Sequence, residues 1–217
     1  MSAIRWAVAA FLLTSAAHAQ TRTLALYAEK PSGMDSFTFQ SLQEELWRLL
    51  APADVDLKWK EADQRYPGEH FDLAIVGSFD GSCAFGDSSS RGNVSSAPSG
   101  SLAHTEITSG RILPFFRVDC VKLTEMLEPA LQRYQGWTRH NIAGRAVARV
   151  IAHEVYHILA KSVDHSDSGV AKPCFSVHDL TTDTFAFELQ SLAEMRPVQK
   201  PRPAGSGGDA LDEASGR

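Results

Sequence analysis

The chain has 217 residues, of which 43% are hydrophobic and 22% charged, and its formal net charge is −5. These values are typical of a globular protein, and the length suits one domain of ordinary size rather than two large ones. The negative charge argues against a nucleic-acid-binding protein, which normally carries a basic surface stripe.

Residues 1–19 have the pattern of a cleavable signal peptide. Arg5 supplies one positive charge, an apolar run covers residues 6–13, and residues 17–19 read Ala-His-Ala. We therefore expect cleavage after Ala19, with an uncleaved N-terminal anchor as the alternative. The apolar run is too short to span a membrane, and no later segment reaches about 18 apolar residues. The pattern predicts a secreted or periplasmic protein without membrane attachment after cleavage.

Residues 20–195 are interpreted as one domain, followed by a disordered tail at 196–217 that is rich in proline and glycine. The first half of the domain predicts the element order β-α-β-β. The expected elements are a strand at 23–29, a helix at 36–50, and strands at 55–59 and 71–77. The last of these is a short continuous apolar run, which is typical of a central strand.

The stretch at 78–101 is rich in serine and glycine, and it is interpreted as a flexible surface loop. Two strands are expected after it, at 102–108 and 111–121, and then a helix at 122–134. Pro114 suits an edge strand or a bulge because it has no backbone N–H. A substrate strand that pairs with an edge at residues 111–118 is one possibility, and an ordinary sheet strand is the other.

Three cysteines follow the expected cleavage point: Cys83, Cys120 and Cys174. Three is an odd number, so at least one thiol stays free. Cys83 and Cys120 flank the same long loop, so we expect a disulfide between them; three unpaired thiols are the alternative. The cysteines are too far apart in sequence for the CxxC pattern of a zinc site.

The strongest predicted helix is 141–161, with Asn141 as its N-terminal cap. His153 and His157 are four residues apart, about one turn, so both imidazoles can contact one metal ion. Glu154 falls on the apolar side of this helix. Burial of a lone carboxylate is costly, so it calls for a reason such as proton transfer beside a metal. The alternative is a pair of ordinary histidines at the border of a helix.

The run His153-Glu154-Val155-Tyr156-His157 resembles the signature of zincin metallopeptidases. The nearby later histidine is similar to the pattern of metzincins, including archaemetzincin-like members. This resemblance implies an α+β, zincin-like single domain with bound Zn²⁺. It also implies a small mixed sheet with an edge strand, packed on an N-terminal helix and a central HExxH helix.

The chain departs from the metzincin pattern HExxHxxGxxH. The glycine position is occupied by Ala160 and the third ligand position by Val163, whereas His165 comes two residues later. His165 is therefore the expected third ligand. The alternatives are Asp164 and Asp167 nearby and Glu188 and Glu194 on a later helix, the last two giving a gluzincin-like arrangement. No convincing Met-turn follows, since Met195 is the only later methionine.

The function expected from these residues is hydrolysis of a peptide or protein substrate by a zinc-activated water, with Glu154 as the general base. Oxyanion stabilisation is a possible role for His140, Tyr156 or His178, although each is more often structural. Two other readings remain open. One is a non-catalytic exported protein that uses zinc structurally or to bind a partner, and the other is an exported α/β binding domain without metal.

Overall fold

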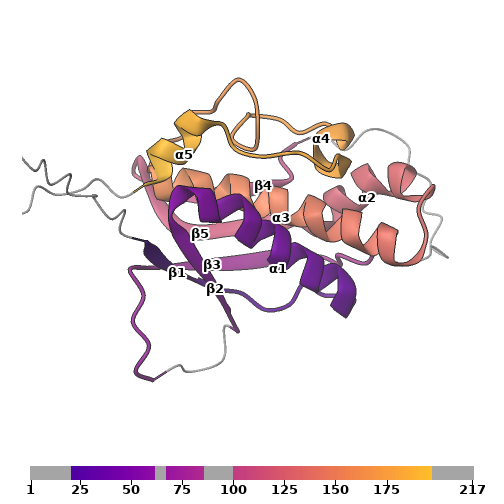
Figure 1. The fold of residues 1–217 in the computed structure, drawn as a ribbon, viewed down its shortest axis with the longest axis horizontal. Helices are drawn as coiled ribbons and strands as arrows, with labels where there is room; N and C mark the ends of the chain where they lie inside the picture. The colour runs from indigo at the N-terminus through magenta and orange to yellow at the C-terminus, as the bar shows by residue number, and fades with distance from the viewer. Residues whose placement is uncertain (1–20, 62–66, 86–99, 197–217) are drawn as a thin grey trace, which may run out of the picture.

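The computed structural model describes residues 21–61, 67–85 and 100–196 (Figure 1). Its elements follow in chain order: β1 (Arg22–Tyr27), α1 (Ser36–Leu50), the short 3₁₀ helix η1 (Ala51–Ala53), β2 (Val55–Lys60), β3 (Leu73–Asp80), β4 (Ala103–Thr108), β5 (Arg111–Asp119), α2 (Cys120–Leu131), α3 (Gly136–Ala160), α4 (Val177–Thr181) and α5 (Leu189–Met195). The expected signal peptide at 1–19 lies outside the described residues. So do residues 86–99 of the expected loop and residues 197–217 of the tail.

The five strands form one mixed sheet in the order β2-β1-β3-β5-β4. The first four strands in this order are parallel to their neighbours, and β4 pairs antiparallel with β5 at the edge. The expected α+β class, the β-α-β-β order of the first half and the central place of β3 are confirmed. The structure itself does not identify a zincin.

Helices α1 and α3 lie side by side against one face of the sheet (Figure 1). Strand β3 alternates between buried Ile75 and exposed Val76, so at this strand one face of the sheet meets the helices and the other meets solvent. Gly144 allows the close approach of the two helices. A Cβ atom there would lie 2.3 Å from the backbone oxygen of Thr38 in α1.

One sequence-based expectation about this region is wrong, and one open alternative is decided. Helix α3 begins at Gly136 with Gln135 as its cap, so Asn141 lies inside the helix, where its side-chain amide donates to Ser41 of α1. Strand β5 is no edge strand, because it pairs with β3 on one side and β4 on the other. The edge strand on this side of the sheet is β4, and β2 forms the opposite edge. The placement of Pro114 at a bulge is correct, since the β4–β5 register shifts opposite it.

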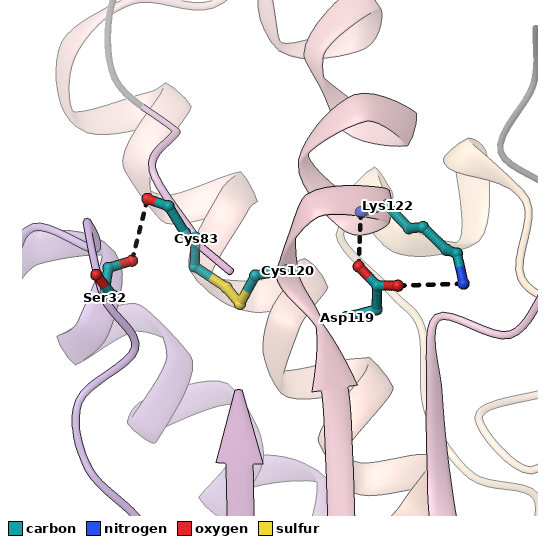
Figure 2. Close-up of a disulfide and its surroundings, with 6 residues drawn as sticks. Ser32, Cys83, Asp119, Cys120 and Lys122 are labelled. Carbon is teal, nitrogen blue, oxygen red and sulfur yellow. Dashed lines mark hydrogen bonds and ion pairs between the residues drawn. A yellow bond between two sulfur atoms is a disulfide. The ribbon is translucent and has the colours of Figure 1, made fainter. Parts of the chain in front are cut away.

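A disulfide joins Cys83 to Cys120, as expected, and it ties the segment after β3 to the first residue of α2 (Figure 2). The backbone N–H of Cys83 also donates to the carbonyl oxygen of Ser32. Cys174 is a free, exposed thiol. A disulfide is compatible with an oxidising compartment. No helix in the described residues has the length and apolar character that crossing a bilayer requires.

Candidate metal centre

Helix α3 places His153 and His157 one turn apart, and both side chains are largely buried. Their Nε2 atoms lie 3.1 Å from each other. The other ring nitrogen of each histidine faces a backbone carbonyl oxygen. These contacts are 2.8 Å from His153 Nδ1 to Val170 and 2.7 Å from His157 Nδ1 to Ser162.

These two carbonyl contacts determine where the ring protons sit. A carbonyl oxygen only accepts, so Nδ1 of each ring carries the hydrogen and each Nε2 presents a lone pair. Two lone pairs cannot form a hydrogen bond with each other. A cation between them would turn this contact into an attraction, and two nitrogens bound to one tetrahedral zinc are about 3.3 Å apart. The pair can therefore act as two ligands of one ion.

Burial favours the neutral state of both rings. It lowers the pKa of His153 to about 4, although the carbonyl of Val170 opposes that shift. It also lowers the pKa of His157. A neutral imidazole is the form that binds a metal, so both side chains are ready to act as ligands at neutral pH.

His165 joins this pair from residues 161–176, which we call the ligand loop. Its ring lies 5.2 Å from the ring of His153 and 4.8 Å from that of His157, measured between centroids. One nitrogen from each of the three histidines lies within 4.8 Å of the others. His165 is exposed, unlike the two helix histidines. The three side chains can therefore hold one metal ion, and the expected ligand set is brought together.

The turn that follows α3 leads the chain into the segment that carries His165. The helix continues through Ala160, and Lys161 then takes a left-handed conformation with φ of 53°. Glycine is the usual residue at such a helix end because a Cβ atom makes this conformation costly. Here lysine adopts it one residue after the glycine position of the metzincin pattern. The carbonyl of the next residue, Ser162, is the one that orients His157.

The far end of the ligand loop is held by buried backbone. Val170 and Ala171 are fully buried, and the backbone N–H of Val170 donates to the carbonyl of Ala186. Gly169 has φ of +69°, and a Cβ atom there would lie 2.6 Å from that same carbonyl oxygen. The glycine thus permits a close crossing of two chain segments, which places the Val170 carbonyl against His153.

Glu154 is 5% exposed, and the hydroxyl of Thr105 in β4 donates to its Oε2 at 2.7 Å. Burial raises the pKa of Glu154 to about 7, although the bond from Thr105 opposes the shift. A cation at the neighbouring histidines would lower that pKa again. Its placement next to the ligands agrees with the sequence-based expectation, and its carboxylate is suited to accept a proton near neutral pH.

Two cavities border Glu154. One, of about 310 Å³, lies between β4 and the three histidines and is lined by Ile107 and Val163, among others. The other, of about 520 Å³, also touches His153 and is lined by apolar side chains that include Met126 and Phe175. Both leave space for a ligand next to the carboxylate.

The other candidates from the sequence do not join the metal group of the described residues. Asp164 accepts from Ser162, while Glu188 accepts from Ser168. Glu194 accepts the hydroxyl proton of Tyr156. Asp167 lies with these carboxylates around a third cavity, of about 360 Å³, which His165 also lines.

Two of the three oxyanion candidates have other partners. His140 lies more than three turns before His153 on α3 and contacts Asp35 and Thr38. Tyr156 is occupied by Glu194. His178 is exposed in the short helix α4. The groups that sequence reasoning missed are Thr105 and the carbonyls of Val170 and Ser162, and none of these carries a motif that would have revealed it.

No protein-family model matches the chain, and no curated protein matches its sequence. The chemistry of the site therefore has to come from its own geometry. That geometry consists of three histidine nitrogens that can share a cation and one buried carboxylate beside them.

Proposed function

We propose that this chain is an exported zinc-dependent peptidase of the zincin type, in which Glu154 is the general base. One observation carries the proposal. Two imidazole lone pairs face each other across 3.1 Å, with a third histidine and a buried carboxylate beside them. A purely structural metal site does not require the carboxylate, whose burial is costly.

Zinc fits this donor set best. Three imidazoles suit zinc, copper, iron or nickel, and three protein ligands with a fourth position left for water are characteristic of catalytic zinc. The carbonyls of Val170 and Ser162 act as outer partners that orient the rings, as is usual for histidine ligands. A zinc ion held there would supply acidification of a water molecule and polarisation of a substrate carbonyl.

Glu154 performs the proton transfers in this proposal. Its carboxylate accepts one proton of the attacking water, while the water oxygen forms a bond to the peptide carbonyl carbon. The same carboxyl group then gives that proton to the amide nitrogen as the C–N bond breaks. The products are a carboxylic acid and an amine, and Glu154 returns to its starting state.

The free edge of β4 is the proposed place for the substrate backbone. The strand ends the sheet beside the cavity at the three histidines, and its Ala103, Thr105 and Ile107 line that cavity. An extended peptide can add to such an edge through main-chain hydrogen bonds. Strand β4 thus replaces residues 111–118 as the proposed docking edge.

The zincin assignment is supported by the arrangement that the resemblance implied. A mixed sheet has one antiparallel edge strand, and a long helix with the HExxH run packs against it. The left-handed Lys161 ends the helix, and His165 on the segment that follows lies beside His153 and His157. Export is supported by the signal-like residues 1–19 and by the Cys83–Cys120 disulfide.

The test is hydrolysis of a peptide library by the zinc-loaded mature protein, residues 20–217, beside Glu154→Gln. We expect the variant to bind zinc equally and to lose about 10²–10⁴-fold in kcat. Glu125→Gln, at an exposed position of α2, is the matched control and should behave as wild type. Cleavage that is equal in Glu154→Gln, or absent in the zinc-loaded wild type, would contradict the proposal.

A further inference from the structure

We propose that Thr105 is a positioning residue for Glu154. Its hydroxyl holds one carboxylate oxygen, so that the other is left to take the proton of the attacking water. This inference rests on the proposed peptidase function and adds a role for the edge strand. Strand β4 then does more than offer its backbone to a substrate, because it also orients the base.

The hydroxyl of Thr105 lies 2.7 Å from Glu154 Oε2 and 3.3 Å from the backbone oxygen of Glu154. A hydroxyl has one proton, so it donates to the nearer and charged acceptor, where a hydrogen bond is strongest. No other described residue donates to this carboxylate. Oε2 is therefore occupied, and Oε1 has no described partner and is available for a water proton.

Thr105 itself is held firmly. It pairs with Phe116 of β5, which is almost fully buried, and the register of the two strands shifts just after it. Such a bulge re-aims a side chain, and a β-branched threonine has few rotamers to choose from. The sheet backbone and the short side chain thus fix the position of the hydroxyl.

This arrangement links substrate docking to the base. A peptide that pairs with β4 would contact the same strand whose side chain fixes Glu154, and Ala103, Thr105 and Glu154 line the same cavity. Loss of the hydroxyl would leave the carboxylate buried without a donor, free to turn away from the water. The backbone edge, and with it substrate binding, would stay as it is.

The test compares Thr105→Val, which keeps the shape and loses the donor, with Thr105→Ser, which keeps the donor. With zinc bound at the wild-type level in both, we expect Thr105→Val to lower kcat about tenfold or more and to leave KM within about twofold. Thr105→Ser should stay within about threefold of wild type. Thr108→Val, exposed on the same strand, is the control for a change in β4 alone.

A second measurement separates this inference from the peptidase proposal. Urea unfolding of the zinc-free protein is followed for Thr105→Val, Glu154→Met and the double variant. We expect Thr105→Val to lower the folding equilibrium constant about tenfold when Glu154 is present and much less when it is methionine. This measurement does not depend on peptidase activity.

The outcomes are distinct. Equal effects of Thr105→Val in both backgrounds, or an unchanged kcat, would overturn the role of Thr105 while the peptidase proposal stands. A zinc-loaded wild type that cleaves no peptide would remove the peptidase function and the catalytic role of Thr105 together. A measured coupling in that case would reduce the contact to a structural one.

Discussion

The three histidines that can hold a metal ion come from two regions of very different character. His153 and His157 lie on α3, a 25-residue helix whose second half is buried almost throughout. His165 is exposed on the ligand loop, which a left-handed turn and a few backbone hydrogen bonds hold in place. We infer that changes in the helix mainly alter the stability of the fold, whereas changes in the loop mainly alter affinity for the metal.

The largest effect on stability is expected at Gly144→Ala. The added Cβ atom would lie 2.3 Å from the backbone oxygen of Thr38 and 2.7 Å from the Cβ atom of Ser41, so α1 and α3 would have to separate. Overpacking against backbone should cost about 3 kcal/mol in the free energy of unfolding, measured in urea. Zinc affinity of the remaining folded protein should change little. A variant as stable as wild type would mean that the two helices are less closely packed.

The pH dependence of the zinc-free protein should divide between the two helix residues His153 and Glu154. His153 has a pKa of about 4 when folded and 6.5 in its ordinary state, so its contribution to stability is present above pH 6.5 and is lost as the pH falls toward 4. Glu154 has a folded pKa of about 7 against 4.5, so its contribution weakens as the pH rises from 4.5 to 7. In the wild type, the two residues therefore change the free energy of unfolding in opposite directions as the pH rises.

Single variants should separate the pH dependence that His153 contributes from the one that Glu154 contributes. Between pH 6.5 and pH 4, the histidine retained in zinc-free Glu154→Gln should lower the free energy of unfolding by on the order of 3 kcal/mol, whereas the glutamate retained in His153→Leu should raise it by on the order of 2 kcal/mol, as followed by urea unfolding. His153→Leu keeps the glutamate and should become less stable, relative to Glu154→Gln, as the pH rises from 4.5 to 7. Parallel curves for the two variants would show that neither group is buried as described.

The ligand loop can be tested at Gly169. Gly169→Ala places a Cβ atom 2.6 Å from the carbonyl oxygen of Ala186 and should shift the Val170 carbonyl away from His153. We expect zinc affinity to fall about 10–100-fold, as titration with a competing chelator would show. Gly110→Ala is the matched control, because its φ of +73° is similar but nothing lies within 4 Å of the new atom. An equal loss of affinity in both variants would exclude the loop crossing as the cause.

The smallest effect is a gain in stability at the start of the ligand loop. Lys161 has a positive φ, so Lys161→Gly should relieve backbone strain and raise the free energy of unfolding by about 0.5–1 kcal/mol. Lys161→Val should lower it by at least as much, since β-branched residues tolerate this conformation poorly. Thermal unfolding of both variants provides the measurement. A glycine variant less stable than wild type would show that this turn is not left-handed.

The part of the site that lies on α3 can be predicted from the sequence because helical spacing is regular. Any helix over these residues places His153 and His157 on one face. The same helical periodicity predicts that Glu154 is buried. The expected cap Asn141 lies five residues inside α3, because asparagine is a good cap by residue type yet here packs against α1. Local preference was overridden there by helix–helix contact.

The part of the site on the ligand loop is harder to predict, since it depends on backbone conformation. The sequence pointed to His165, but nothing in it specified that Lys161 would be left-handed or that the Val170 carbonyl would reach His153. The role of Thr105 depends on the pairing of β4 with β5, a contact between strands whose order one sequence does not specify. The disulfide partner of Cys83 was accessible because both cysteines flank one loop.

The central claim is that three histidines from these two regions bind one zinc ion. Elemental analysis of the purified mature protein, residues 20–217, beside His165→Ala tests it most directly, with the exposed His178→Ala as control. We predict about one zinc per chain in the wild type and the control, and loss or sharp weakening of binding in His165→Ala. A wild type that takes up no zinc even after incubation with the metal, or full zinc content in His165→Ala, would contradict the three-histidine site.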